Sequence, residues 1–129
     1  IFENLGIKSN LIYKFGDETE LLKTYQRSKL YVSLSLMEGF GLTNLEAMSS
    51  GCPVLCSKIP IFKEILKDSC EYVEPTNVNE VQSKIEKIIK SQSEQKNLIN
   101  KGYKRASNFS WEKCASDTLE IYKKILNEK

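Results

Sequence analysis

The chain has 129 residues, of which 40% are hydrophobic and 28% are charged, and this length and balance are typical of one globular domain. Nineteen basic and seventeen acidic side chains leave a net charge of +2, too near neutral for the basic surface that binds nucleic acid, and no apolar run is long enough to cross a membrane. Histidine is absent, which excludes histidine-based triads, general bases and metal ligands within this chain.

Strand-forming and helix-forming segments alternate over the first part of the chain. Four strands are predicted from runs of apolar, β-branched and aromatic residues, at 11–15, 30–36, 53–56 and 70–73. The helix after the first strand is predicted to begin at Asp17, with Glu20 three residues later as in a capping box. Two more helices are expected over 42–49, ending at Gly51, and over 61–66. This order suits β–α–β crossovers, which impose parallel pairing of the strands.

The rest of the chain is predicted to be helical, because apolar residues recur at helical spacing from Val78 onward. A more polar helix is expected over 91–107, and a last helix near Trp111. Trp111 and Tyr122 are predicted to pack this last helix onto the domain, whereas the lysines at positions 84, 87 and 90 are expected to face solvent. The predicted fold class is α/β, a partial Rossmann-like parallel sheet of about four strands with flanking helices and a helical C-terminal tail.

Four cysteines are predicted to be free thiols, buried or half-buried: Cys52, Cys56, Cys70 and Cys114. They form no Cys-x-x-Cys pair, and without histidine the usual zinc sites lack ligands. The sequence shows no signal-peptide pattern, so we expect a reducing, cytoplasmic location in which the thiols act as small hydrophobic side chains.

The segment that begins at Glu38 carries the strongest chemical signal. It follows a predicted strand and leads into a helix, which is where open parallel sheets bind their ligands. Gly39 and Gly41 lack a Cβ, so a ligand can approach the backbone there. Leu42 and Thr43 open the helix, and their unpaired N–H groups and the partial positive charge of the helix suit a phosphate.

Two carboxylates, Glu38 and Glu46, bracket this helix start. A carboxylate accepts hydrogen bonds from adjacent sugar hydroxyls, but it is repelled by a diphosphate. We therefore expect the two glutamates to bind hydroxyls on either side of the phosphates, and this pattern describes a nucleotide-sugar. The alternative is that both glutamates are ordinary surface carboxylates. Each would then interact only with solvent, and Glu46 also with the helix dipole.

The segment resembles the E-x7-E signature of the retaining glycosyltransferases of family 4, which have the GT-B fold. The sequence letters EGFGL, LEAM and SGCPV occur in the family's usual order. Further matches extend the resemblance over nearly the whole chain, at Phe15-Gly16, Leu34-Ser35, Tyr72-Val73-Glu74-Pro75 and Phe109-Ser110-Trp111.

The resemblance implies sugar transfer from a nucleoside diphosphate sugar to an unknown acceptor, without a metal or another cofactor. It implies that Glu38 contacts the donor sugar near the reacting centre and that Glu46 binds the nucleotide ribose. Its other implied donor-binding positions lie along the path of the sugar and the phosphates, at Gly39, Phe40, Gly41, Leu42 and Thr43.

Family members carry two further strands before the point where this chain starts, in a sheet of order 3-2-1-4-5-6. Because the chain begins with Ile1, we expect residues 1–129 to be a truncated nucleotide-sugar-binding domain that lacks the first two strands and has no turnover alone. A glycan or lipid-linked acceptor is expected to bind mainly on an N-terminal domain absent here, in polysaccharide assembly. Peripheral association of the full-length protein with the cytoplasmic face of a membrane is a family-level expectation.

Two other function classes remain open from the residues. A non-catalytic nucleotide-sugar-binding or interaction module would keep the same motif, and an acceptor domain with catalytic groups would argue against it. A glycoside hydrolase would use Glu38 and Glu46 as acid and base, with carboxyl groups roughly 5 to 9.5 Å apart across a cleft. The glycine-rich helix start favours phosphate over that arrangement.

Overall fold

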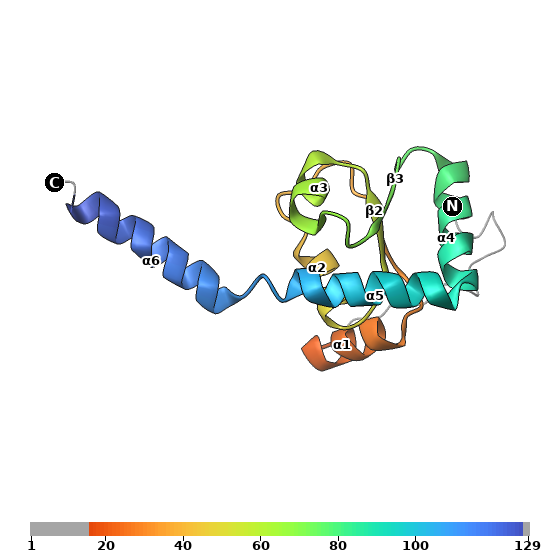
Figure 1. The fold of residues 1–129 in the computed structure, drawn as a ribbon, viewed down its shortest axis with the longest axis horizontal. Helices are drawn as coiled ribbons and strands as arrows, with labels where there is room; N and C mark the ends of the chain where they lie inside the picture. The colour runs from red at the N-terminus through yellow and green to blue at the C-terminus, as the bar shows by residue number, and fades with distance from the viewer. Residues whose placement is uncertain (1–15, 128–129) are drawn as a thin grey trace.

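The structure is a computed structural model that describes residues 16–127. A three-stranded sheet lies inside a body of packed helices, and the last helix extends away from this body (Figure 1). The strand expected over 11–15 lies outside the described residues. In chain order the elements are α1 (Glu18–Arg27), β1 (Tyr31–Ser33), α2 (Leu42–Ser49), β2 (Val54–Ser57), α3 (Pro60–Leu66), β3 (Glu71–Val73), α4 (Val78–Lys90), α5 (Gln92–Ala106) and α6 (Trp111–Asn127).

The three strands pair in parallel, in the order β1-β2-β3. Val32 of β1 lies opposite Leu55 of β2, and Cys56 of β2 lies opposite Tyr72 of β3. All four residues of β2 are buried, as expected for a parallel strand that is covered on both faces. The predicted α/β class, with a parallel sheet, flanking helices and a helical C-terminal tail, is confirmed.

Two apolar clusters cover the two faces of the sheet, because successive residues of a strand point to opposite faces. Val54 and Cys56 of β2 belong to the larger cluster, which also contains the fully buried Phe62 of α3. Leu55, between them, belongs to the smaller cluster with Ile88 of α4. The central strand therefore joins both halves of the core.

Helix α1 begins where the sequence predicted, since the Asp17 carboxylate accepts a hydrogen bond from the backbone N–H of Glu20 at 2.9 Å. Tyr25 is the one buried residue of this helix. The Tyr25 ring is therefore the main apolar anchor that holds α1 to the body.

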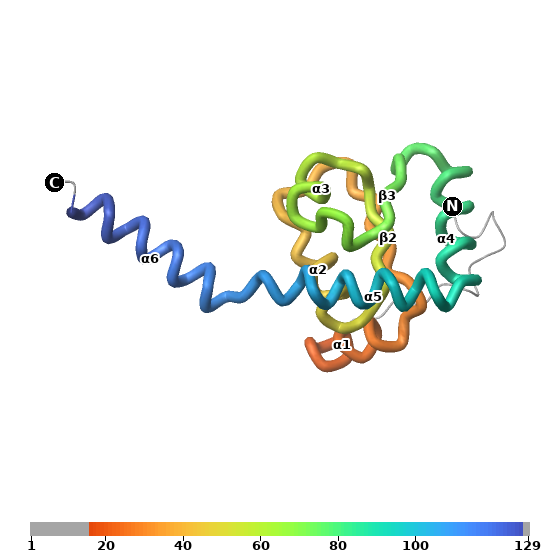
Figure 2. The backbone as a smooth tube through the Cα atoms, viewed as in Figure 1, coloured from red at the N-terminus to blue at the C-terminus, as the bar shows by residue number. Residues whose placement is uncertain are grey.

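Helix α2 is fixed at its C-terminal end and along one side. Gly51, at φ +78°, donates its N–H to the Met48 carbonyl at 3.1 Å. The Cys52 N–H donates to the Ala47 carbonyl at 2.9 Å, which completes a Schellman-type end. α5 runs beside α2 (Figure 2), and a Cβ added at Gly102 of α5 would lie 3.2 Å from the Met48 Cγ. The predicted helix end at Gly51 is confirmed.

Helix α6 does not pack as the sequence predicted. Trp111 is 74% exposed and Tyr122 is 61% exposed, so their expected place in the core is wrong. The chain leaves the body after α5, and no residue within 16–127 covers the apolar side of α6 (Figure 1). Cys114 is exposed for the same reason, contrary to expectation.

Within the part of the chain that the structure describes, no helix combines the length and apolar character needed to cross a membrane.

The other three thiols are free and buried, as predicted. Burial raises the pKa of Cys52 to about 11. The Cys56 and Cys70 Sγ atoms lie 3.5 Å apart, and this contact together with burial raises the pKa of Cys56 far above its usual range. Cys52 and Cys56 therefore stay protonated at neutral pH, and all three buried thiols pack as small apolar side chains.

Substitution of Phe62 and of Trp111 tests the two opposite environments. Phe62→Ala is expected to lower the free energy of unfolding by about 3–5 kcal/mol, because it empties a fully buried site in the larger cluster. Trp111→Ala is expected to change it by less than about 0.5 kcal/mol, because the indole is mostly exposed. Urea unfolding followed by circular dichroism measures both. An equal loss at Trp111 would contradict the placement of α6.

Candidate functional site

The connection from β1 to α2 ends in a tight backbone corner at Gly41. Gly41 is buried and has φ +90°, a conformation that glycine adopts without strain. A Cβ added there would lie 2.6 Å from Cε1 of the Phe62 ring. Gly39, two residues earlier, is exposed, and apart from its chain neighbours no described residue lies within 4 Å of the place where its Cβ would be. The corner is therefore packed against the core at Gly41 and exposed to solvent at Gly39.

The start of α2 is open to solvent. Leu42 and Thr43 are both exposed, and no side chain in the described part of the chain caps the helix. The Asn44 N–H donates to the Gly41 carbonyl at 3.0 Å. Within residues 16–127 the N–H groups of Leu42 and Thr43 have no protein acceptor. The geometry thus leaves two outward amides and the positive end of the helix dipole at the surface, an arrangement that can bind an anion.

The two glutamates singled out by the sequence are exposed, and each is oriented by one hydroxyl group. Ser35 Oγ donates to Glu38 Oε1 at 3.0 Å. Tyr25 Oη donates to Glu46 Oε2 at 3.4 Å, which links α1 to α2. Each carboxylate keeps its second oxygen for another donor, so both can accept hydrogen bonds from ligand hydroxyls.

A pair of tyrosines lies behind the helix start, and sequence reasoning gave neither a role in the site. The Tyr25 and Tyr31 rings meet edge to face, with centroids 5.6 Å apart. Tyr31 Oη donates to Thr43 Oγ1 at 3.0 Å, so the Thr43 hydroxyl proton is left to point elsewhere. Together the pair orients the side chains of Thr43 and Glu46. Helical spacing marks Tyr25 only as part of an apolar face, and Tyr31 only as part of a strand.

Burial, then the neighbouring Tyr31 and Glu46, raise the pKa of Tyr25 to about 12. The Tyr25 phenol is therefore neutral over the physiological range and keeps its proton for the bond to Glu46.

Phe40 joins the turn to the connection between α5 and α6. Its ring meets that of Phe109 edge to face, with centroids 5.8 Å apart, and the Arg105 guanidinium lies 4.8 Å from the centroid of Phe109. A groove of about 530 Å³ opens beside this contact, between α2 and the start of α6. Glu46 and Trp111 also line the groove.

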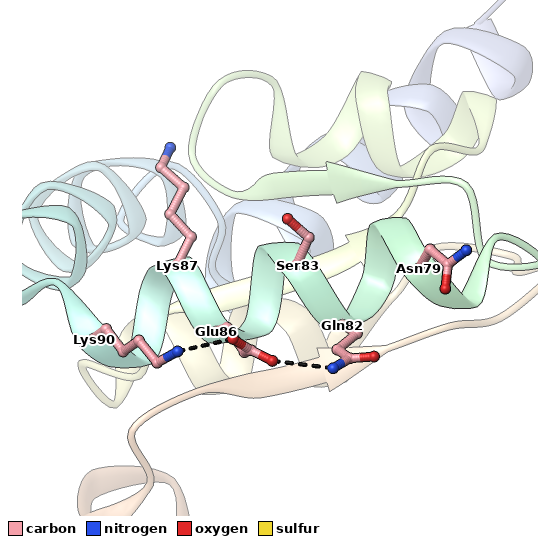
Figure 3. Close-up of a pocket in the computed structure, with 6 residues that line it drawn as sticks. All are labelled: Asn79, Gln82, Ser83, Glu86, Lys87 and Lys90. Carbon is pink, nitrogen blue, oxygen red and sulfur yellow. Dashed lines mark hydrogen bonds and ion pairs between the residues drawn. The ribbon is translucent and has the colours of Figure 1, made fainter.

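A second hollow lies on α4, and Figure 3 shows that its labelled side chains all come from this one helix. Glu86 accepts hydrogen bonds from Gln82 at 3.1 Å and from Lys90 at 2.8 Å. Lys87 and Lys90 are exposed as predicted, whereas Lys84 is half-buried and pairs with Glu71, contrary to expectation. This hollow is a solvent-exposed face of one helix, and its polar side chains do not point toward a common ligand position (Figure 3). No group of three or more potential metal-ligating side chains occurs among residues 16–127.

Comparison with known proteins connects this geometry to one family. The model of a family described as "Glycosyl transferases group 1" matches residues 1–105. O-antigen chain mannosyltransferase B of Escherichia coli is 33% identical over 106 residues, which are 82% of this chain and 28% of that protein. The MMP alpha-(1->4)-mannosyltransferase of Mycolicibacterium hassiacum is 33% identical over 131 residues, covering 98% and 32%. The chain thus spans 28% and 32% of the length of these two relatives.

Two solved structures share the fold. A sucrose-phosphate synthase from Thermosynechococcus elongatus superposes with a TM-score of 0.88 at 22% identity, over 99% of this chain and 33% of that one. The C-terminal domain of a glycosyl transferase group 1 family protein from Francisella tularensis superposes with a TM-score of 0.70 at 27% identity, over 83% and 57%. The fold of this chain is therefore that of Rossmann-like GT-B domains.

The two glycines of the turn form a matched pair for substitution. Gly41→Ala is expected to lower the free energy of unfolding by at least about 1–2 kcal/mol, because of the left-handed conformation and the contact with Phe62. Gly39→Ala is expected to stay within about 0.5 kcal/mol of the unsubstituted chain, since its Cβ meets nothing. Chemical unfolding measures both. Equal effects would mean that the corner does not rest on the core.

The raised pKa of Tyr25 predicts a loss of stability at alkaline pH. In the unfolded chain the phenol ionises near pH 10, whereas in the folded chain it ionises near pH 12, so unfolding becomes easier as the pH rises through this window. The free energy of unfolding, measured between pH 9 and 12, is expected to fall less steeply in Tyr25→Phe than in the unsubstituted chain. Identical slopes would contradict a protected phenol.

Proposed function

This chain belongs to the group 1 glycosyl transferases, and on that basis we propose that it is the donor-binding part of a retaining glycosyltransferase that takes a sugar from a nucleoside diphosphate sugar. Residues 1–129 form, in this proposal, one nucleotide-sugar-binding domain. The observation that carries it is the open start of α2 between Glu38 and Glu46. The exposed helix start suits the charged diphosphate of such a donor, and the two carboxylates suit the sugar hydroxyls on either side of it. The glycine corner leaves room for the donor to approach the backbone.

The diphosphate is proposed to bind at the start of α2. The N–H groups of Leu42 and Thr43 would donate to phosphate oxygens, and the helix dipole favours the negative charge. The Thr43 hydroxyl, which accepts from Tyr31, can donate its own proton to the same phosphate. Gly39, Phe40 and Gly41 would form the path along which the sugar and the phosphates lie.

The two carboxylates are proposed to hold the sugars on either side of the diphosphate. Glu46, which is held by Tyr25, would accept from the ribose hydroxyls of the nucleotide. Glu38, which is held by Ser35, would accept from the hydroxyls of the donor sugar close to the reacting carbon. Each keeps an oxygen that faces no described donor, and a charged acceptor gives a stronger bond to a hydroxyl than a neutral one does.

The chemical contribution of this part of the protein would be to stabilise the departing diphosphate. Negative charge grows on the leaving oxygen as the bond to the sugar breaks, and fixed amides directed at that charge lower the barrier without reorganising. The proposal assigns this role to backbone dipoles, so it requires no metal ion. The Tyr25–Tyr31 pair behind the helix would keep these groups in position.

The acceptor is proposed to be a growing glycan or a lipid-linked glycan in polysaccharide assembly. Two relatives carry the printed names "O-antigen chain mannosyltransferase", which makes mannose the first sugar to test. Because the chain spans only 28% of one of these relatives, the acceptor would bind mainly outside it. We place the reaction in the cytoplasm, with the full-length protein able to contact the membrane face.

Substitution of Glu46 in the full-length transferase tests this proposal. A panel of nucleoside diphosphate sugars that includes nucleoside diphosphate mannose is titrated by calorimetry. Glu46→Gln is expected to weaken binding of the accepted donor roughly ten- to hundredfold, because a charged hydrogen bond to the ribose is lost. Glu38→Gln is expected to lower kcat while the free nucleoside diphosphate binds as before.

The matched control is Glu86→Gln on the exposed face of α4, which is expected to change neither binding nor turnover. Failure of every donor to bind the full-length protein would refute the proposal. Binding that is unaffected by Glu46→Gln would refute the assigned role of this carboxylate.

A further inference from the structure

Asn44, on the first turn of α2, carries a buried side-chain amide. It is fully buried, and within the described part of the chain neither Oδ1 nor Nδ2 has a partner. A buried amide without partners opposes folding, because water satisfied both of its polar atoms in the unfolded chain. Most buried polar side chains in proteins are paired, so an exception at this position calls for a reason.

The amide of Asn44 lies directly beneath the glycine corner. Its Nδ2 would be 3.0 Å from a Cβ added at Gly41, beside the Phe62 ring. Asn44 is also the third residue of α2, the position from which a polar side chain commonly reaches back to the backbone N–H of the residue that caps the helix. Here that cap is Gly41, and the reciprocal bond is not made.

The backbone that could satisfy Asn44 is exposed on the N-terminal side of Gly41. Every residue from Leu36 to Phe40 is exposed, and Gly39 has no neighbour within 4 Å of its Cβ position. By contrast, α2 is held by the core and by α5. A small movement of this exposed backbone, with the Gly41 Cα left against the Phe62 ring, would therefore bring backbone groups to the amide without disturbing the core.

We propose that Asn44 is a positioning residue onto which the turn of residues 39–41 closes when a diphosphate binds at the start of α2. The inference rests on the proposed function. In the closed arrangement the Gly41 N–H donates to Asn44 Oδ1, and Nδ2 donates to a carbonyl of the turn. The hydrogen bonds that the free protein lacks then add to the affinity for the diphosphate, because they form only in the bound state.

A purely structural role predicts a different behaviour. A polar side chain left in the core by chance would weaken the folded state and would leave ligand binding unchanged. Removal of the amide is expected to leave stability equal or higher under both explanations, so its effect on the affinity for the diphosphate separates them.

The test compares Asn44→Leu, which keeps the branched shape and removes both polar atoms, with Met48→Leu, a substitution of similar volume at a buried position on the same helix. Both are made in the full-length transferase. UDP and GDP are titrated by calorimetry, and urea unfolding is measured without nucleotide. Asn44→Leu is expected to weaken binding of the accepted diphosphate roughly tenfold and to leave the urea midpoint equal or higher. Met48→Leu is expected to leave the affinity unchanged.

Asn44→Val, which adds less volume, replaces Asn44→Leu if the larger side chain prevents folding, and its binding of diphosphate is expected to weaken likewise. In the unsubstituted protein, the side-chain amide protons of Asn44 are expected to shift in NMR spectra and to exchange more slowly when the diphosphate is added. Unchanged affinity in the folded Asn44 variant would overturn this inference alone. Failure of both UDP and GDP to bind the unsubstituted protein would overturn it together with the proposed function.

Discussion

The close contact between Gly41 and the Phe62 ring determines how the rest of the site is arranged. Gly41 can turn the chain at φ +90° and approach the ring because it has no Cβ. The helix that follows then begins with its first amides directed outward, while its inner face joins the larger apolar cluster. The geometry of the candidate site is thus tied to the packing of the core beneath it.

The polar side of the site is held by neutral hydroxyl groups. Tyr25 and Tyr31 each donate to one side chain of α2, and Ser35 donates to Glu38. A neutral donor orients a carboxylate without cancelling its charge, so the carboxylate still attracts ligand hydroxyls. The rings of Tyr25 and Tyr31, which carry two of these hydroxyls, pack edge to face against each other. This packing restricts where the two hydroxyl groups can lie.

Rigid and loose parts meet at the start of α2. The helix is held by its Schellman-type end and by α5, whereas the turn that precedes it is exposed from Leu36 to Phe40 and is buried only at Gly41. The unpaired amide of Asn44 lies at the boundary between them. In the proposed donor site, the fixed amides would supply the electrostatics and the exposed turn would supply the movement.

Local sequence determined the α/β class and both ends of α2. The alternation of apolar strands with capped helices and the helix end at Gly51 depend on neighbours a few residues away, so the sequence predicts them directly. The contact of Gly41 with the Phe62 ring joins residues far apart in the chain, and the sequence did not indicate it. Contacts between separate elements were decided only by the tertiary structure, because they depend on how helices dock. Tyr25 meets Glu46 across 21 residues of chain, and Asn44 is buried beneath the corner without a partner among the described residues. Helix α6 keeps its apolar side exposed because no described element packs against it.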